Sequence, residues 1–344
     1  MAVPLFSRAL SNLPVGISRV WLRRILLANL IAQVGIVLTG GVVRLTGSGL
    51  GCPTFPQCVP GSYIPVVNQS QGIHKYIEFG NRMLTTVVSV MAVAALLAVL
   101  RYVRDGRAGR GLLVLGAVPF LGVMAQALIG GITVLTQLNP TVVAVHFLVS
   151  MGLIAGSTLL LLAAVPPKDD HPSPVPVLSR RLSVAAAAVG AVVLTLGTLV
   201  TGSGPHSGDA EDPNRFSFDI PLVTRMHSGA VWLFVLLVIA IVVLLGRAAA
   251  PHQSWSRPAD WSLSRRWAAA LLLVTLGQGV IGYLQYALGV PAWLVAVHML
   301  GACLFVITTT GTAYALRLSP EGRTTADPER RPVASGHRSS PVPS

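Results

Sequence analysis

Long apolar runs separated by short polar segments recur eight times along the chain. A helical run of about 20 residues spans a hydrocarbon core of about 30 Å. The runs lie at residues 25–44, 80–100, 111–135, 141–165, 183–202, 222–246, 267–288 and 292–316. The pattern predicts an all-α integral membrane protein with eight transmembrane helices, the first of which is retained rather than cleaved as a signal peptide.

Composition and charge agree with a protein of the lipid bilayer. Hydrophobic residues make up 53% of the chain and charged residues 11%, whereas soluble domains carry roughly 25% charged residues. The net charge of +13 is spread over short loops and tails, which argues against nucleic acid as a partner. Because arginine is concentrated at one set of helix ends, the positive-inside rule places both termini in the cytoplasm, as expected for a multi-pass protein of the cell membrane.

The two halves of the chain repeat each other. Residues 124–148 match residues 276–300 without a gap, and the tetrapeptide TGSG occurs at residues 46–49 and 201–204. The shift of the first match is 152 residues, and it pairs Gln126 with Gln278, Gly130 with Gly282 and His146 with His298. The repeat predicts two tandem, pseudo-symmetric four-helix bundles.

The repeat and the polar ends together divide the chain into five segments. These are an N-terminal cytoplasmic tail (1–20), an N-terminal bundle (21–165), a cytoplasmic linker (166–182), a C-terminal bundle (183–317) and a disordered cytoplasmic tail (318–344). The last segment is rich in Pro, Ser, Thr and Arg and cannot bury a core.

Three histidines lie at similar depths inside even-numbered spans, where an ionisable side chain indicates a functional site. They are His146, His227 and His298. His227 and His298 form a complete pair in the C-terminal half, which suits the iron of a bis-histidine heme b. Zinc is a weaker candidate because it normally takes three or four protein ligands. Four further histidines are expected to be solvated in loops or the tail, namely His171, His206, His252 and His337.

The N-terminal half lacks the second histidine. When residues 78–83 are aligned with residues 224–229, Asn81 takes the place of His227. The polar residues that share a helix face with Asn81 are His74, Glu78 and Arg82. A functional carboxylate at Glu78 is one interpretation of this face, and an ion pair with Arg82 at the partly solvated membrane edge is the other.

Two cysteines lie in the first outer loop, on the side where disulfides persist. We expect Cys52 and Cys58 to form a disulfide, rather than to be two free thiols or a metal pair, and Cys303 to be a core residue of the last span. The arginines near the outer ends of spans are candidates for contact with heme propionates, or for snorkelling to the interface: Arg44, Arg82 and Arg225.

Five motifs give the chain a resemblance to the heme A synthase family over residues 20–317. They are TGSGLGCPTFPQC (46–58), IHKYIEFGNRM (73–83), VAVHFL (143–148), MHS (226–228) and VAVHML (295–300). The resemblance implies heme b as the cofactor of the C-terminal bundle and heme O as the substrate of the N-terminal bundle. It also implies that a ring methyl is oxidised to a formyl group by successive hydroxylations, giving heme A for a terminal oxidase.

Residue roles follow from the same resemblance. His227 and His298 match the cofactor-heme ligands, His146 matches a substrate-site histidine, and Glu78 matches an essential glutamate. Cys52 and Cys58 match an outer-loop cysteine pair. The chain departs from the family motif at Asn81, where the family has a histidine. The second protein ligand of the iron in the first site could then be His74, Asn81 itself or no protein group.

Two other functions compete with this one. A quinone-linked cytochrome b subunit would need bis-histidine hemes and no substrate pocket, but it would be expected to keep four ligands rather than three. A transporter would also fit a parallel repeat, but the spans carry almost no charge at mid-depth. A heme O synthase and an electron donor are candidate partners, and the sequence leaves a homo-oligomer open.

Overall fold

Eight helices make up most of the part of the chain that the structure describes. The computed structural model describes residues 16–169, 173–209, 211–249 and 261–319. The helices are α2 (Arg19–Leu45), α3 (His74–Arg104), α4 (Gly111–Leu135), α5 (Pro140–Ala164), α6 (Val177–Ser203), α7 (Ile220–Arg247), α8 (Leu263–Ala287) and α9 (Ala292–Leu318). Predictions for residues 1–15 and 320–344 of the tails, and for His171, His252 and His337, lie outside the described residues.

All eight helices are long and apolar enough to cross a membrane. The prediction of an all-α membrane protein with eight spans is therefore confirmed. Several helices extend past the predicted apolar run: α3, for example, begins at His74 rather than at residue 80. Polar residues can continue a helix beyond the hydrocarbon core because its backbone hydrogen bonds do not depend on apolar side chains.

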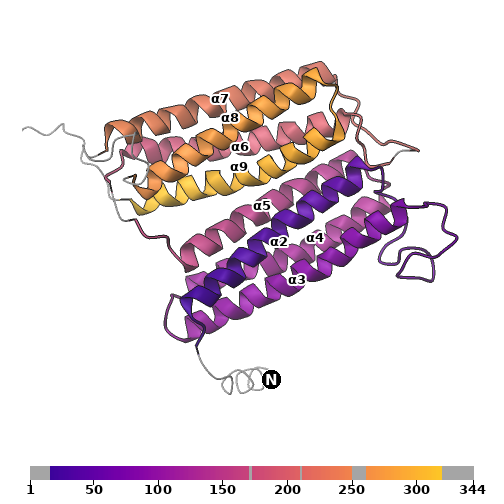
Figure 1. Ribbon diagram of the computed structural model, residues 1–344, viewed down its shortest axis with the longest axis horizontal. Helices are drawn as coiled ribbons and strands as arrows, with labels where there is room; N and C mark the ends of the chain where they lie inside the picture. Colours follow the sequence, from indigo (N-terminus) through magenta and orange to yellow (C-terminus); the bar gives the residue numbers. More distant parts are fainter. Residues whose placement is uncertain (1–15, 170–172, 210, 250–260, 320–344) are drawn as a thin grey trace, which may run out of the picture.

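Figure 1 shows α2–α5 on one side of the molecule and α6–α9 on the other. Each helix packs against its neighbour in the chain, α2 also contacts α5, and α6 also contacts α9. Helix α9 touches both α2 and α5, so the two groups are in direct contact. That the groups are repeats related by an axis along the membrane normal stays a prediction.

One hydrophobic cluster runs through both groups. It contains Leu30 of α2, Ile154 of α5, Phe234 of α7 and Phe305 of α9. The rings of Phe234 and Phe305 lie 4.7 Å apart between centroids. Large apolar side chains such as Leu273, which is 74% exposed, face outward, as expected for helices in lipid.

Four loops lie at one end of the helices, which we call the disulfide side: residues 46–73, 136–139, 204–219 and 288–291. Here the two groups are joined by hydrogen bonds. Arg44 Nε donates to the carbonyl of His206 at 2.6 Å, and its Nη2 donates to the carbonyl of Thr201 at 3.0 Å. The backbone N–H of Gly49 donates to Gly208 at 2.8 Å. The end of α2 and the start of its loop are therefore bonded to the end of α6 and the start of the loop that follows it.

Candidate functional site

The three intramembrane histidines and Asn81 lie at one level of the structure. Counted from the first residue of its helix, His146 is seventh in α5 and His298 is seventh in α9. His227 is eighth in α7, and Asn81 is eighth in α3. All four helices begin on the disulfide side, so these side chains share a depth of about 10 Å along the helix axes.

Each histidine ring lies against a glycine of the preceding helix. The pairs are Gly130 with His146, Gly197 with His227 and Gly282 with His298, where an added Cβ would lie 3.3, 3.3 and 3.8 Å from the imidazole Cε1. The missing side chain lets the imidazole edge approach the helix backbone.

The ring nitrogens suit metal ligation. His227 Nδ1 lies 3.0 Å from the carbonyl oxygen of Val193, which only accepts, so Nδ1 carries the proton and Nε2 keeps its lone pair. The Nδ1 atoms of His146 and His298 are buried without a hydrogen-bond partner among the described residues.

This donor set fits a heme iron better than a zinc ion. The described residues bring no three His, Cys, Asp or Glu side chains together as a metal site. Structural zinc needs four protein ligands and catalytic zinc three, whereas a heme iron takes four nitrogens from the porphyrin and needs only one or two from the protein. His227 and His298 would hold such an iron in the second group, and His146 would contact one in the first.

His74 lies away from the histidine level. It is the first residue of α3, seven residues before Asn81, which is about 10 Å along the helix axis. Its Nδ1 is 2.8 Å from the hydroxyl of Ser48 in the loop that precedes α3. His146 is therefore the one histidine that the described part of the first group provides at this level.

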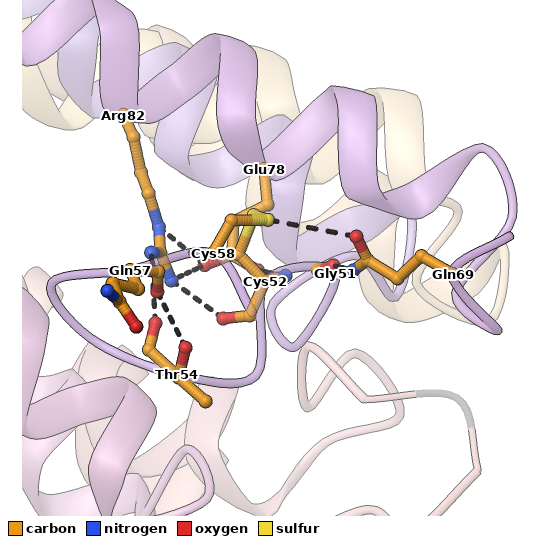
Figure 2. A network of polar contacts seen from close by, with 8 residues as sticks. All are labelled: Gly51, Cys52, Thr54, Gln57, Cys58, Gln69, Glu78 and Arg82. Carbon is orange, nitrogen blue, oxygen red and sulfur yellow. Dashed lines mark hydrogen bonds and ion pairs between the residues drawn. A yellow bond between two sulfur atoms is a disulfide. The ribbon is translucent and has the colours of Figure 1, made fainter. Parts of the chain in front are cut away.

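Glu78 and Arg82 form a buried ion pair, shown in Figure 2. Glu78 Oε1 accepts from Arg82 Nη2 at 2.6 Å and from Nε at 3.0 Å. Oε2 accepts from the backbone N–H of Cys52 at 2.6 Å. The Glu78 side chain is 6% exposed and that of Arg82 20%, so the ion pair of the second interpretation is present but less solvated than that interpretation assumed. Burial arises because the loop of residues 46–73 covers this end of α3.

The remaining donors of Arg82 hold the disulfide loop, residues 52–58 (Figure 2). Nη2 donates to the carbonyl of Cys52 at 2.7 Å, while Nη1 donates to the carbonyls of Thr54 at 3.0 Å and Gln57 at 3.2 Å. The Phe55 ring packs against α4, where it would block a Cβ at Gly131. The loop is thereby fixed to both α3 and α4, directly above the first group.

The predicted disulfide between Cys52 and Cys58 is present, and Cys303 is free and buried in α9. In the protein as isolated, alkylation after denaturation without reductant is expected to label one cysteine per chain, and prior reduction should raise this to three. Mass spectrometry of tryptic peptides would locate the label. Labelling of all three without reductant would contradict an oxidised pair.

Cys52→Ser should lower activity more than it lowers the content of cofactor heme. The reason is that the disulfide loop covers the first group, whereas the cofactor heme is expected in the second.

The arginines predicted to contact propionates differ in their surroundings. Arg44 and Arg82 donate to backbone carbonyls, whereas the exposed Arg225 makes no side-chain hydrogen bond within the described residues. His206 was expected to be solvated, but it is half-buried and its Nε2 lies 3.0 Å from the carbonyl of Val290. This contact joins two loops of the second group, and no pattern in the sequence pointed to it.

Comparison with known proteins identifies the family. The family model described as "COX15-CtaA: Cytochrome oxidase assembly protein" matches residues 23–310. The heme A synthase of Bacillus mycoides (strain KBAB4) is 24% identical over 285 residues, covering 79% of this chain and 86% of the relative. The heme A synthase of Geobacillus kaustophilus (strain HTA426) is 35% identical over 129 residues, 37% of this chain and 38% of the relative. With a family match over most of its length, the chain belongs to the COX15-CtaA family of cytochrome oxidase assembly proteins.

Proposed function

We propose that the chain is a heme A synthase, an oxidoreductase that converts a ring methyl of heme O into the formyl group of heme A. The observation that carries the proposal is the unequal histidine content of the two groups at one level. The second group offers His227 and His298, whereas the first offers His146 alone. A resident cofactor with two ligands in the second group, and a more weakly held substrate in the first, would account for this asymmetry. The names of the relatives support the proposed function.

The second group would hold heme b between His227 and His298. With His227 and His298 as its protein ligands, this heme would supply electron transfer when bound. The chain orients one ligand through the bond from His227 Nδ1 to Val193, since a donor at Nδ1 fixes both the ring plane and the tautomer. Gly197 and Gly282 leave room for the rings against their neighbouring helices.

The first group would bind heme O beside His146 and under the disulfide loop. Packing of Phe55 on α4 and the bonds from Arg82 to the loop carbonyls close this end of the group against water. We assign Glu78 to proton handling near the reacting methyl. Oε1 accepts two hydrogen bonds from the Arg82 guanidinium, whereas Oε2 accepts from the backbone N–H of Cys52. We assign proton acceptance to Oε2, because it is the oxygen that is not paired with the guanidinium.

Propionate binding remains proposed for Arg44, Arg82 and Arg225. Arg225 is the best placed of the three, because it lies two residues before His227 on α7 and its guanidinium has no bond within the described residues. Arginine binds a carboxylate through two parallel hydrogen bonds. Arg44 and Arg82 would have to contact a propionate in addition to the carbonyls they already hold.

We place the protein in the cell membrane with the disulfide side outward and both termini in the cytoplasm. The disulfide supports this orientation, because such bonds persist outside the cytoplasm. The positive-inside rule applied to the arginine-rich ends supports it independently. A heme O synthase and an electron donor remain the proposed partners.

The function is tested by acid extraction and chromatography of heme from membranes of the native host. Deletion of the gene is expected to abolish heme A and to cause heme O to accumulate, and expression of the intact chain should restore heme A. Expression of His146→Ala at the same membrane level is the matched control, and it should not restore heme A. Normal heme A in the deletion strain would overturn the proposal and favour an electron-transfer cytochrome b.

A further inference from the structure

Asn81 occupies the position in the first group that His227 occupies in the second. Both are the eighth residue of their helix, and the repeat aligns them. Helix α3 packs on α2 and α4, which separate it from α5, as α6 and α8 separate α7 from α9. Asn81 and His146 therefore lie at one level on two helices that are not direct neighbours, as His227 and His298 do.

The carboxamide of Asn81 is held in one orientation by Thr39 of α2. Thr39 Oγ1 lies 2.7 Å from Asn81 Oδ1, a separation typical of an O–H···O hydrogen bond. Thr39 Oγ1 is also 3.2 Å from the carbonyls of Gly35 and Ile36. Two oxygens at 2.7 Å repel each other unless a proton lies between them, so the Thr39 hydroxyl donates its proton to Asn81 Oδ1. The same proton is then not directed at the backbone carbonyls of Gly35 and Ile36.

The other end of the carboxamide is free. No described residue accepts a hydrogen bond from Asn81 Nδ2. Nδ2 lies beside Gly40 of α2, where a Cβ added to the glycine would be 3.9 Å from it. With its oxygen accepting from Thr39, Asn81 presents two N–H donors at the other end of the carboxamide.

This arrangement argues against Asn81 as an iron ligand. An amide nitrogen is a poor ligand because its lone pair is delocalised into the carbonyl, and the oxygen is already occupied by Thr39. Asparagine is also shorter than histidine. The residue can, however, donate a hydrogen bond to something bound on that face.

We propose that Asn81 Nδ2 donates a hydrogen bond to a small diatomic ligand on the heme iron of the first site, on the face opposite His146. The proposal rests on the proposed function, since it requires heme O in that site. The ligand class is a diatomic molecule whose outer atom has a lone pair. Asn81 would thus select and orient a ligand on the iron of the first site. The iron of the second group, held by two histidines, would have no position free for such a ligand. Thr39 is the positioning residue, because it decides which end of the carboxamide faces the iron.

The test uses carbon monoxide as the probe on purified protein supplied with heme O and then reduced. The readout is the C–O stretching frequency in the infrared, which falls when a donor contacts the outer oxygen. Asn81→Leu is expected to bind carbon monoxide but to shift the stretch to higher frequency. Thr39→Val should shift or split the band, because the carboxamide is then free to rotate. Thr86→Val, an exposed position on the same helix, should leave the band unchanged.

A further variant places an imidazole at residue 81. Asn81→His should create a second imidazole ligand, so the first iron should become low-spin and lose most of its carbon monoxide binding. An identical C–O stretch in the wild type and Asn81→Leu, with heme O bound, would overturn the inference while leaving the synthase function standing. A wild-type first iron that is already low-spin and inert to carbon monoxide would overturn it as well. Failure of the chain to bind any heme O would instead remove the proposed function, and the inference with it.

Discussion

His298→Ala and His227→Ala are each expected to strip most of the low-spin heme b from the purified protein. Each variant removes one of the two imidazoles, and the described residues offer no cluster of other His, Cys or carboxylate ligands to replace it. His227→Ala also loses the bond to the Val193 carbonyl that orients the ring. The measurement is the ratio of heme, determined as the pyridine complex, to protein, together with the reduced b-type absorption band.

His146→Ala is the matched control for this pair, because its ring has the same helix position as His298 and the same kind of glycine contact as both. It should retain the low-spin heme b and lose the binding of added heme O. Persistence of the low-spin spectrum in both cofactor variants, with its loss in His146→Ala, would show that the two groups have been assigned the wrong way round.

The features predicted correctly from the sequence depend on local patterns. A transmembrane span is recognised by the length of its apolar run, so all eight spans were predicted in the correct order. The ends of the predicted runs lie within about six residues of the ends of the observed helices. The gapless repeat likewise predicted a common depth for His146 and His298, because equal spacing along two helices that start at the same side gives equal depth. Cys52 and Cys58 were paired because both lie in an outer loop, on the side where disulfides persist.

The contacts that define the first site were not predictable in the same way. Arg82 bonds to carbonyls 25 to 30 residues away in the chain, and backbone acceptors leave no trace in a residue pattern. The bond between Thr39 and Asn81 depends on how α2 and α3 are rotated about their axes, which is set by tertiary packing. For the same reason the contact of Gly197 with His227 was missed, although the repeat did pair Gly130 with Gly282.

Glu78→Gln is expected to keep heme b in the second group and to accumulate heme O, or a hydroxylated intermediate, in place of heme A. Glutamine preserves the size of the side chain but removes the charge and turns one oxygen into a donor. Both Glu78 oxygens now accept from donors, so the new amide N–H groups must face either Arg82 or the N–H of Cys52. Extraction and chromatography of the hemes, with heme b quantified in the same sample, is the measurement.

Loss of the buried ion pair is the competing cause of such a defect, and a second variant separates it from loss of the proton acceptor. Breaking a buried pair costs about 3–5 kcal/mol, and the disulfide loop would loosen because Arg82 and Cys52 both lose their carboxylate partner. Arg82→Met breaks the same pair, and also releases the loop carbonyls, but leaves the Glu78 carboxylate in place. If Glu78 handles protons, Arg82→Met should still make some heme A while Glu78→Gln makes almost none. If the two variants lose heme A to the same extent, Glu78 acts only by holding the loop over the first site, and its assignment to proton handling must be given up.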